Sequence, residues 1–175
     1  MVDVSGLGVH VMRWGEGRPV WLQHGNPTWG FLYRHVVAEL LDCGVELICP
    51  DLVGLGLSDR PRTSWHTLDQ HATALGAVVE KLGLRDLIFV GQDWGGPVGL
   101  RALANMPDRL SGMVLLNTVI GPPRPGFRPT AFHRVSQVPG VSELLFRGLG
   151  FPNRTLHLAQ GDRRTLRGDV ARAYR

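Results

Sequence analysis

The sequence lacks any apolar run close to the roughly 20 residues that a membrane-spanning helix requires. Its first residues, Met1 to Val4, have neither the basic residues nor the apolar core of a secretory signal. Only two cysteines occur, Cys43 and Cys49, on either side of a predicted helix-to-strand connection. A disulfide between them stays an alternative, but we expect both to be buried free thiols. There is no internal repeat, and we expect a cytoplasmic globular protein without a membrane partner.

Acidic residues are scarce in the last third of the chain. Residues 121–175 contain ten arginines against three acidic residues, a net charge of +7, which leaves −3 of the overall +4 for residues 1–120. An arginine-rich segment is one signature of a nucleic-acid surface. Here the arginines are scattered, with no run longer than Arg163-Arg164, and this favours an ordinary solvated surface. We therefore expect no nucleic-acid partner.

The hydrophobic periodicity predicts alternating strands and helices as far as residue 120. The predicted strands lie at 9–12, 19–25, 46–50, 87–90 and 113–116, and the predicted helices at 31–43, 67–82 and 94–105. Thr67 and Gln70 have the spacing of a capping box at the start of the second helix. Strands separated by helices indicate βαβ units, so the predicted fold class is α/β, with a mostly parallel sheet covered by helices on both faces.

The pattern changes at residues 121–126, where glycine and proline cluster. Beyond this point the sequence predicts short helices over 141–149 and 164–174 and no convincing strand. We therefore expect a core of residues 1–120 and the beginning of a helical cap over 121–175. Because Arg175 falls within a helical pattern without a stop signal, the fold is expected to be incomplete at the C-terminus.

The most informative motif is Gly91-Gln92-Asp93-Trp94-Gly95, directly after the predicted strand at 87–90. Its spacing is that of a nucleophile elbow, a sharp strand-to-helix turn written G-x-S-x-G when the nucleophile is serine. Glycine suits both flanking positions, because a side chain there would collide between strand end and helix start. A central aspartate attacks a saturated, electrophilic carbon and forms an alkyl ester that water then hydrolyses. The alternative is that Asp93 is only the N-cap of the next helix.

A second motif, His24-Gly25-Asn26-Pro27, ends the predicted strand at 19–25. A glycine-containing loop at this position supplies one backbone N–H of an oxyanion hole, and the residue after the nucleophile supplies the other. This pairing makes Asn26 and Trp94 the candidate donors. A third motif, the glycine-rich loop over 50–61, follows the predicted strand at 46–50.

In this order and spacing, the segments HGNPTWGFLYR, PDLVGLGLSDRP and GQDWGGPVGL resemble the haloalkane dehalogenases of the α/β-hydrolase superfamily, over about residues 4 to 120. The resemblance implies that Asp93 is the nucleophile, and that the Trp94 indole and the Asn26 side-chain amide hold the departing halide. It implies no cofactor and no metal, and its partners are a small apolar halogenated substrate, water and the halide product. The aromatic residues near the motifs predict an apolar pocket, lined by Trp29, Phe31, Phe127 and Phe132.

The base and the acid of such a reaction are harder to find. His24 adjoins the oxyanion loop, but the family places its base near the C-terminus, so structural support of the loop is favoured. The remaining candidates, His66 and His71 at a helix start and His133 and His157 in the irregular segment, show no partner pattern. Where some family members carry the acid, this chain has Asn117 and Thr118, neither of them ionisable; others carry it after a strand that lies beyond Arg175. Two further acidic residues, Asp51 and Asp59, are expected to shape their own loop.

Two other functions stay open. Epoxide hydrolases share the aspartate elbow, but they need acidic hydroxyls, and Tyr33 and Tyr174 are the only tyrosines here. Asn26 stands where that family often has phenylalanine, and an asparagine favours halide binding. The other possibility is a catalytically incomplete fragment or degenerate hydrolase. Without a base, this 175-residue chain is expected not to turn over, and an uncovered sheet edge after residue 116 is expected to limit its solubility.

Overall fold

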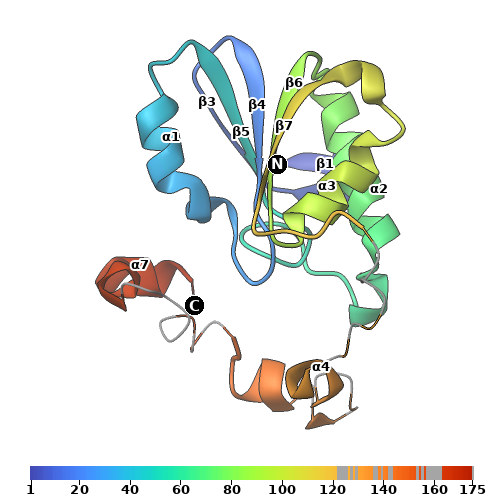
Figure 1. Cartoon of the computed structure of the whole chain (residues 1–175), viewed down its shortest axis with the longest axis vertical. Helices are drawn as coiled ribbons and strands as arrows, with labels where there is room; N and C mark the ends of the chain where they lie inside the picture. The colour runs from blue at the N-terminus through green and yellow to red at the C-terminus, as the bar shows by residue number, and fades with distance from the viewer. Residues whose placement is uncertain are drawn as a thin grey trace. The chain divides into compact units, whose positions relative to one another are not determined.

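The structure is a computed structural model that describes residues 1–121 and, after them, residues 126, 128, 130–135, 138, 140–141, 144–152, 154, 156 and 163–174. The chain divides into two compact units, Met1–Gly121 and Pro122–Arg175 (Figure 1). This boundary lies one residue from the predicted one. The second unit's identity as part of a cap stays a prediction, and the two units are described separately.

The first unit is built on a five-stranded sheet with the order β3-β5-β4-β6-β7. The strands are β3 (Val11–Trp14), β4 (Arg18–Gln23), β5 (Val45–Pro50), β6 (Leu87–Gln92) and β7 (Leu110–Leu116). Only β3 is antiparallel to its neighbour, and the other pairs are parallel. Two more short strands, β1 (Val2–Val4) and β2 (Leu7–Val9), form a separate antiparallel pair. The predicted α/β class with a mostly parallel sheet is confirmed.

The predicted strand over residues 9–12 is wrong in detail, because the chain changes partner at His10. β2 ends at Val9 and β3 begins at Val11. Between them, the His10 N–H donates to the Ser58 hydroxyl at 2.9 Å, and its ring contacts Asp51. Alternating apolar residues predict extended backbone, but they do not say that two halves of a run pair with different strands.

Helices cover both faces of the sheet (Figure 1). On one side lie η1 (Gly30–Tyr33) and α1 (Arg34–Leu40), and on the other lie α2 (Leu68–Lys81) and α3 (Gly95–Leu103). Successive side chains of a strand point to opposite faces, so Val20 and Leu22 join the core beneath α1 whereas Trp21 joins the larger core beneath α2 and α3. Two smaller 3-10 helices, η2 (Thr63–Trp65) and η3 (Pro107–Arg109), precede α2 and β7.

The predicted start of α2 is confirmed at atomic detail. Thr67 is the N-cap, and its hydroxyl accepts the Gln70 N–H at 3.2 Å. Such a cap stabilises a helix by about 1 kcal/mol because it satisfies a donor that has no intrahelical partner.

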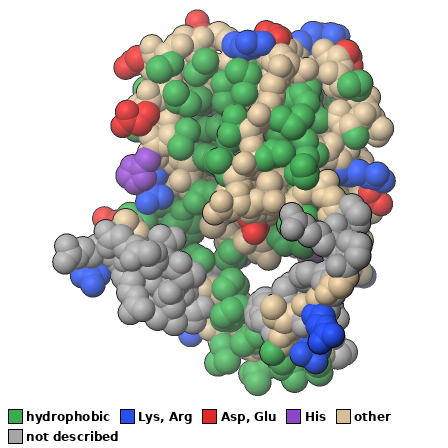
Figure 2. Space-filling model, viewed as in Figure 1, with side chains coloured by type: hydrophobic (Ala, Val, Ile, Leu, Met, Phe, Trp, Pro, Cys, Tyr) green, Lys and Arg blue, Asp and Glu red, His purple; other side chains and the backbone are tan. Residues whose placement is uncertain are grey.

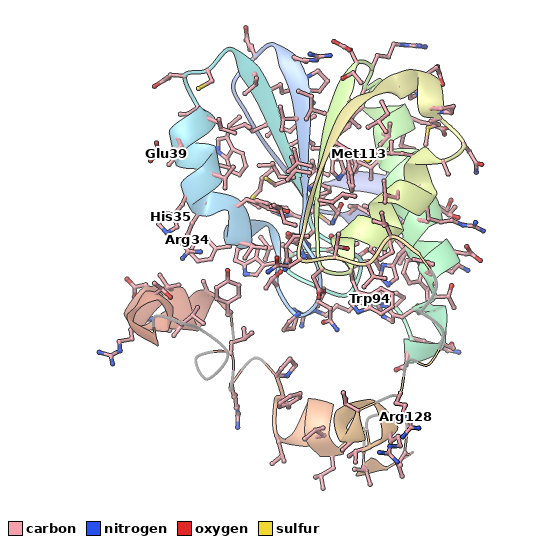
Figure 3. The ribbon with its side chains drawn as sticks, viewed as in Figure 1. Arg34, His35, Glu39, Trp94, Met113 and Arg128 are labelled. Carbon is pink, nitrogen blue, oxygen red and sulfur yellow. The ribbon has the colours of Figure 1, made fainter. Side chains whose placement is uncertain are left out.

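The outer strand β7 leaves apolar surface uncovered in the first unit. Its side chains at Met113, Val114 and Leu116 are each close to half exposed. Figure 3 labels Met113 on this strand, and Figure 2 shows hydrophobic side chains over the sheet on the viewed face. This agrees with the expected exposure at this edge.

The described part of the second unit contains only short helices. They are α4 (Ala131–Val135), the π-helical η4 (Leu144–Gly148), η6 (Arg163–Leu166) and α7 (Gly168–Ala173). The predicted helix over 141–149 thus corresponds to η4, and the one over 164–174 to η6 and α7. No helix among the described residues of either unit is long and apolar enough to cross a membrane.

Both cysteines are free thiols, so the disulfide alternative is wrong. Cys49 is buried in the core beneath α1, and burial, followed by the nearby Asp51 carboxylate, raises the pKa of its thiol to about 12. Cys43 is exposed, so the expectation that it is buried is wrong. It follows the end of α1 at the surface.

Candidate active site at the ends of two neighbouring strands

The candidate site lies where the chain reverses its path across the sheet. β4 pairs with β5 on one side and with β6 on the other, and Gln23 of β4 stands in register with Gly91 of β6. The loops after β4 and β6 therefore leave the same end of the sheet in different directions. In open α/β sheets, ligands bind in the crevice that such a divergence creates.

Asp93 occupies a strained turn directly after β6. Its φ of +52° lies in the left-handed region, which costs a non-glycine residue about 1–3 kcal/mol. Two donors hold its backbone carbonyl in this conformation, the Thr118 hydroxyl at 2.6 Å and the Gly96 N–H at 3.1 Å. The carboxylate does not cap α3, whose N-cap residue is Trp94. The alternative that Asp93 serves only as a helix N-cap is therefore wrong.

Glycines allow β4 and α3 to approach each other closely at this turn. A Cβ on Gly95 would clash with the backbone carbonyls of Gln23 and His24, the second at 2.5 Å. A Cβ on Gly91 would lie 2.9 Å from the Gly96 Cα, in the first turn of α3. The predicted reason for glycine at both elbow positions is confirmed, since no rotamer change moves these backbone atoms aside.

The loop after β4 brings Asn26 to the Asp93 carboxylate. The Asn26 N–H donates to Asp93 Oδ1 at 2.9 Å. Gly25 permits this approach, because a Cβ there would lie 2.6 Å from the Asp93 Cβ and equally close to the Trp94 backbone nitrogen. Asn26 thus meets Asp93 and Trp94 at one place, although Asn26 and Asp93 are 67 positions apart in the sequence.

Asn26 and Trp94 also line one cavity of about 440 Å³, whereas Asp93 itself is not among the residues that line it. Its remaining walls are formed by the loop after β5, the start of α2 and one residue of α3, namely Leu52, Val53, Gly54, Leu55, His66, Thr67, Leu68, His71 and Val98. Trp94 is half exposed, and Figure 3 shows it beside the amino-terminal end of α2. A mostly apolar cavity with a few polar groups is typical of small-molecule sites.

The aromatic lining predicted for the pocket is wrong for the residues that the structure describes. Trp29 and Phe31 stack on each other at 5.6 Å, and Arg34 covers the Phe31 ring at 4.6 Å. Neither ring lines the cavity, because η1 begins between them and turns them toward each other. The side chains of Phe127 and Phe132 lie outside the described residues.

His24 supports the loops and is not free to act as a base. It is fully buried, its Nδ1–H donates to the Gly25 carbonyl at 2.9 Å, and its Nε2 accepts the Leu52 N–H at 2.9 Å. These bonds fix the neutral tautomer, and burial lowers the pKa of His24. The expected structural role is confirmed, since His24 ties the loop after β4 to the loop after β5.

Asp51 shapes its own loop as expected, whereas the Asp59 carboxylate bonds a residue outside the loop. The buried Asp51 carboxylate accepts the N–H groups of Gly30 and Leu57 at 2.7 and 3.0 Å. Asp59 accepts the Gly8 N–H at 2.7 Å and so connects the loop to β2. Neither carboxylate lines the cavity.

Two structural features of the candidate site could not be recognised from the sequence. Thr118 braces the Asp93 carbonyl across 25 residues, and no local pattern marks such a contact. His66 and His71 show no partner pattern in the sequence, yet they pair with each other, since His66 Nδ1 lies 3.1 Å from His71 Nε2. Their spacing of five residues is not a helical neighbour spacing, and only the extended backbone at Thr67 brings the rings together.

We expect this pair to make stability depend on pH. Burial, followed by the nearby His66, lowers the pKa of His71 to about 4, whereas an unfolded histidine has a pKa of about 6.5. Between these values the unfolded chain binds more protons, so stability is full above pH 6.5 and falls as the pH drops toward 4. Thermal unfolding of the His71→Gln variant should lose less stability over this range than the unchanged chain. Equal pH slopes for both proteins would contradict this assignment.

Comparison with known proteins agrees with the geometry. A family model for the α/β hydrolase fold matches residues 18–161. Haloalkane dehalogenase 2 of Mycobacterium tuberculosis is 38% identical over 154 residues, which cover 88% of this chain and 53% of that protein. The chain spans about half the length of the curated relatives it matches.

Solved structures also align with nearly the whole chain, among them a haloalkane dehalogenase and an epoxide hydrolase. The haloalkane dehalogenase DatA from Agrobacterium tumefaciens C58 has a TM-score of 0.85 and 28% identity, over 99% of this chain and 60% of that one. The epoxide hydrolase VrEH1 from Vigna radiata has a TM-score of 0.83 and 25% identity, over 99% of this chain and 64% of that one.

Proposed function

Because this chain belongs to the α/β-hydrolase family, we propose that it acts in the hydrolytic dehalogenation of haloalkanes to alcohol and halide, through an alkyl ester on Asp93. One observation carries the proposal. Asp93 stands on a left-handed turn with its carboxylate bound to the Asn26 N–H, beside a cavity that Asn26 and Trp94 share. Its dehalogenase relatives support the same chemistry.

In the first step a carboxylate oxygen of Asp93 attacks the carbon that bears the halogen. A carbon–oxygen bond forms while the carbon–halogen bond breaks, and the halide leaves with the bonding electrons. The Asn26 N–H already holds Oδ1 and no described residue donates to Oδ2, so Oδ2 is the oxygen for this attack. The proposed donors to the halide are the Trp94 indole N–H and the Asn26 amide. A halide is a large anion, and weak N–H donors in an apolar cavity suit it.

In the second step water attacks the carbonyl carbon of the ester. The oxyanion of the tetrahedral intermediate then forms on Oδ1, the oxygen that faces the Asn26 N–H. The Trp94 backbone N–H is the proposed second donor. Loss of one such donor raises a barrier by about 2.7–4 kcal/mol. Collapse of the intermediate breaks the bond between Cγ and Oδ2, so the alcohol leaves with Oδ2 and one proton of the water. The water oxygen stays in the Asp93 carboxylate, and the second proton passes to solvent.

Epoxide hydrolysis is the second candidate, and one observation weighs against it. That reaction needs an acidic hydroxyl to protonate the epoxide oxygen. The Tyr33 hydroxyl is buried beneath η1 and donates to the Gln23 carbonyl at 3.0 Å, and burial raises the pKa of Tyr33. Tyr33 is thus committed to the fold. Tyr174, the other tyrosine, belongs to the second unit.

The test compares the two substrate classes on the purified chain. Bromide release from 1-bromohexane, together with a hexyl adduct in the intact mass, is the expected result. The same chain should form neither a hydroxyalkyl adduct nor a diol with 1,2-epoxyhexane. An adduct or diol from the epoxide without bromide from the bromoalkane would replace dehalogenation with epoxide hydrolysis.

The free thiols fit a reducing compartment, and we propose that the protein is located in the cytoplasm.

Replacement of Trp94 with phenylalanine should weaken halide binding. The change keeps the apolar ring and removes only the indole N–H, and a hydrogen bond to a charged group contributes about 1.5–3 kcal/mol. We therefore expect the bromide Kd to rise at least tenfold, measured by calorimetry because the fluorescent reporter is the residue changed. Trp14→Phe, on β3 at the far side of the sheet, is the matched control and should leave the Kd unchanged. A Kd that Trp94→Phe does not alter would remove the indole from the halide site.

A further inference from the structure

The cavity beside Asp93 has a second polar group that the dehalogenation steps do not use. His66 and His71 line it together with Asn26 and Trp94, and most of the remaining wall is aliphatic. His66 directly follows η2, and His71 lies in the first turns of α2. Figure 3 shows Trp94 beside this end of α2.

The two imidazoles are held in place from several sides. His66 Nδ1 and His71 Nε2 lie 3.1 Å apart. The Trp65 ring contacts both imidazoles edge-on, with centroid distances of 5.5 and 5.0 Å. The loop after β5 lies against His66, since a Cβ on Gly54 would be 2.5 Å from its Cε1. These contacts hold the pair in the cavity wall, with His66 exposed and His71 partly buried.

Burial determines which nitrogen of each ring carries the proton. His71 Nδ1 is buried without a hydrogen-bond partner. A buried N–H without an acceptor is rarer than an unpaired acceptor, so the His71 proton belongs on Nε2, where it is donated to His66 Nδ1. His66 then carries its own proton on Nε2. In the part of the chain that the structure describes, this N–H has no protein acceptor.

We propose that the His66 Nε2–H is a substrate-binding donor, and that the cavity selects haloalkanes that carry a hydroxyl or ether oxygen at a distance from the carbon–halogen bond. The inference rests on the proposed function. The aliphatic wall accommodates the carbon chain, and His66 receives the oxygen. A plain haloalkane would cover the N–H without replacing its bond to water, and sites built to bond a substrate oxygen discriminate against analogues that lack it.

The test compares two substrates of equal length, 6-bromohexan-1-ol and 1-bromoheptane. The measured quantity is the ratio of their second-order rate constants for bromide release and ester formation. The ratio is the rate constant for the bromoalcohol divided by that for the bromoalkane. We expect His66→Phe to lower it about tenfold or more relative to the unchanged chain. His66→Gln, which keeps an N–H donor, should recover part of it. His35→Phe is the matched control, because His35 is exposed on α1 on the other side of the sheet and should leave the ratio unchanged (Figure 3).

The outcomes separate this inference from the proposed function. Without bromide or adduct from either substrate, the proposed function fails. With both reactions present but the same ratio in the unchanged chain and in His66→Phe, the role of His66 fails. If His66→Phe does not fold, nitrogen-15 NMR of the unchanged chain still tests the proton positions. Protons on Nε2 of both rings are expected, and a proton on His71 Nδ1 would overturn the proposal.

Discussion

Replacement of Asp93 with asparagine should abolish ester formation and bromide release from 1-bromohexane, by more than about 10³-fold. The neutral amide oxygen is a poor nucleophile toward a saturated carbon. The fold should survive, because an asparagine oxygen can still accept the Asn26 N–H that Oδ1 accepts at 2.9 Å. Asparagine also tolerates the left-handed backbone of this position better than most residues.

Asp86→Asn is the matched control for this result. Asp86 directly precedes β6, whereas Asp93 directly follows it, and both residues have a positive φ, 53° and 52°. Asp86 forms an exposed ion pair with Arg18 at the opposite end of the strand. Its substitution should leave bromide release unchanged. Equal bromide release by Asp93→Asn and Asp86→Asn would show that Asp93 is not the nucleophile.

The second large effect is expected from Gly95→Ala, which should lower the free energy of unfolding by about 3 kcal/mol or more. The added methyl group would collide with the backbone carbonyls of Gln23 and His24. Relief requires the end of β4 to separate from the start of α3, which would also move Asn26 away from Asp93. Urea unfolding gives the stability, and bromide release gives the accompanying loss of activity.

Gly112→Ala shows what an added methyl group does where there is room. Gly112 lies within β7, and nothing lies within 4 Å of a Cβ built on it. Its substitution should leave stability unchanged or slightly raised, since alanine restricts the unfolded chain more than glycine. If both alanine variants unfold at the same urea concentration, the close approach of β4 and α3 does not limit stability.

Features that depend on neighbouring residues in the sequence could be predicted. The elbow was found because glycines flank Asp93 at fixed positions after an apolar strand, and the start of α2 because Thr67 and Gln70 lie within one turn. The meeting of Asn26 with Asp93 was expected from the oxyanion-hole pairing of the two motifs, and the adjacent parallel strands β4 and β6 bring it about.

Features that depend on distant packing could not be predicted in the same way. The brace from Thr118 to the Asp93 carbonyl joins the end of β7 to the elbow, and a threonine after a strand gives no sign of it. Trp29 and Phe31 have the composition of a pocket wall, yet the start of η1 stacks them on each other. The direction of a side chain in a loop follows from the tertiary structure and not from its hydrophobicity.

The position of the alkyl group after reaction tests directly whether Asp93 is the nucleophile. The chain is mixed with 1-bromohexane, quenched with acid at successive times, digested and analysed by tandem mass spectrometry. We expect a hexyl ester on Asp93 that forms together with the released bromide. The exposed Cys43 thiol should be modified more slowly, and Asp93→Asn should not change that slower reaction. Bromide release with Asp93 unmodified at every quench time, or with the hexyl group only on Cys43, would contradict this role of Asp93.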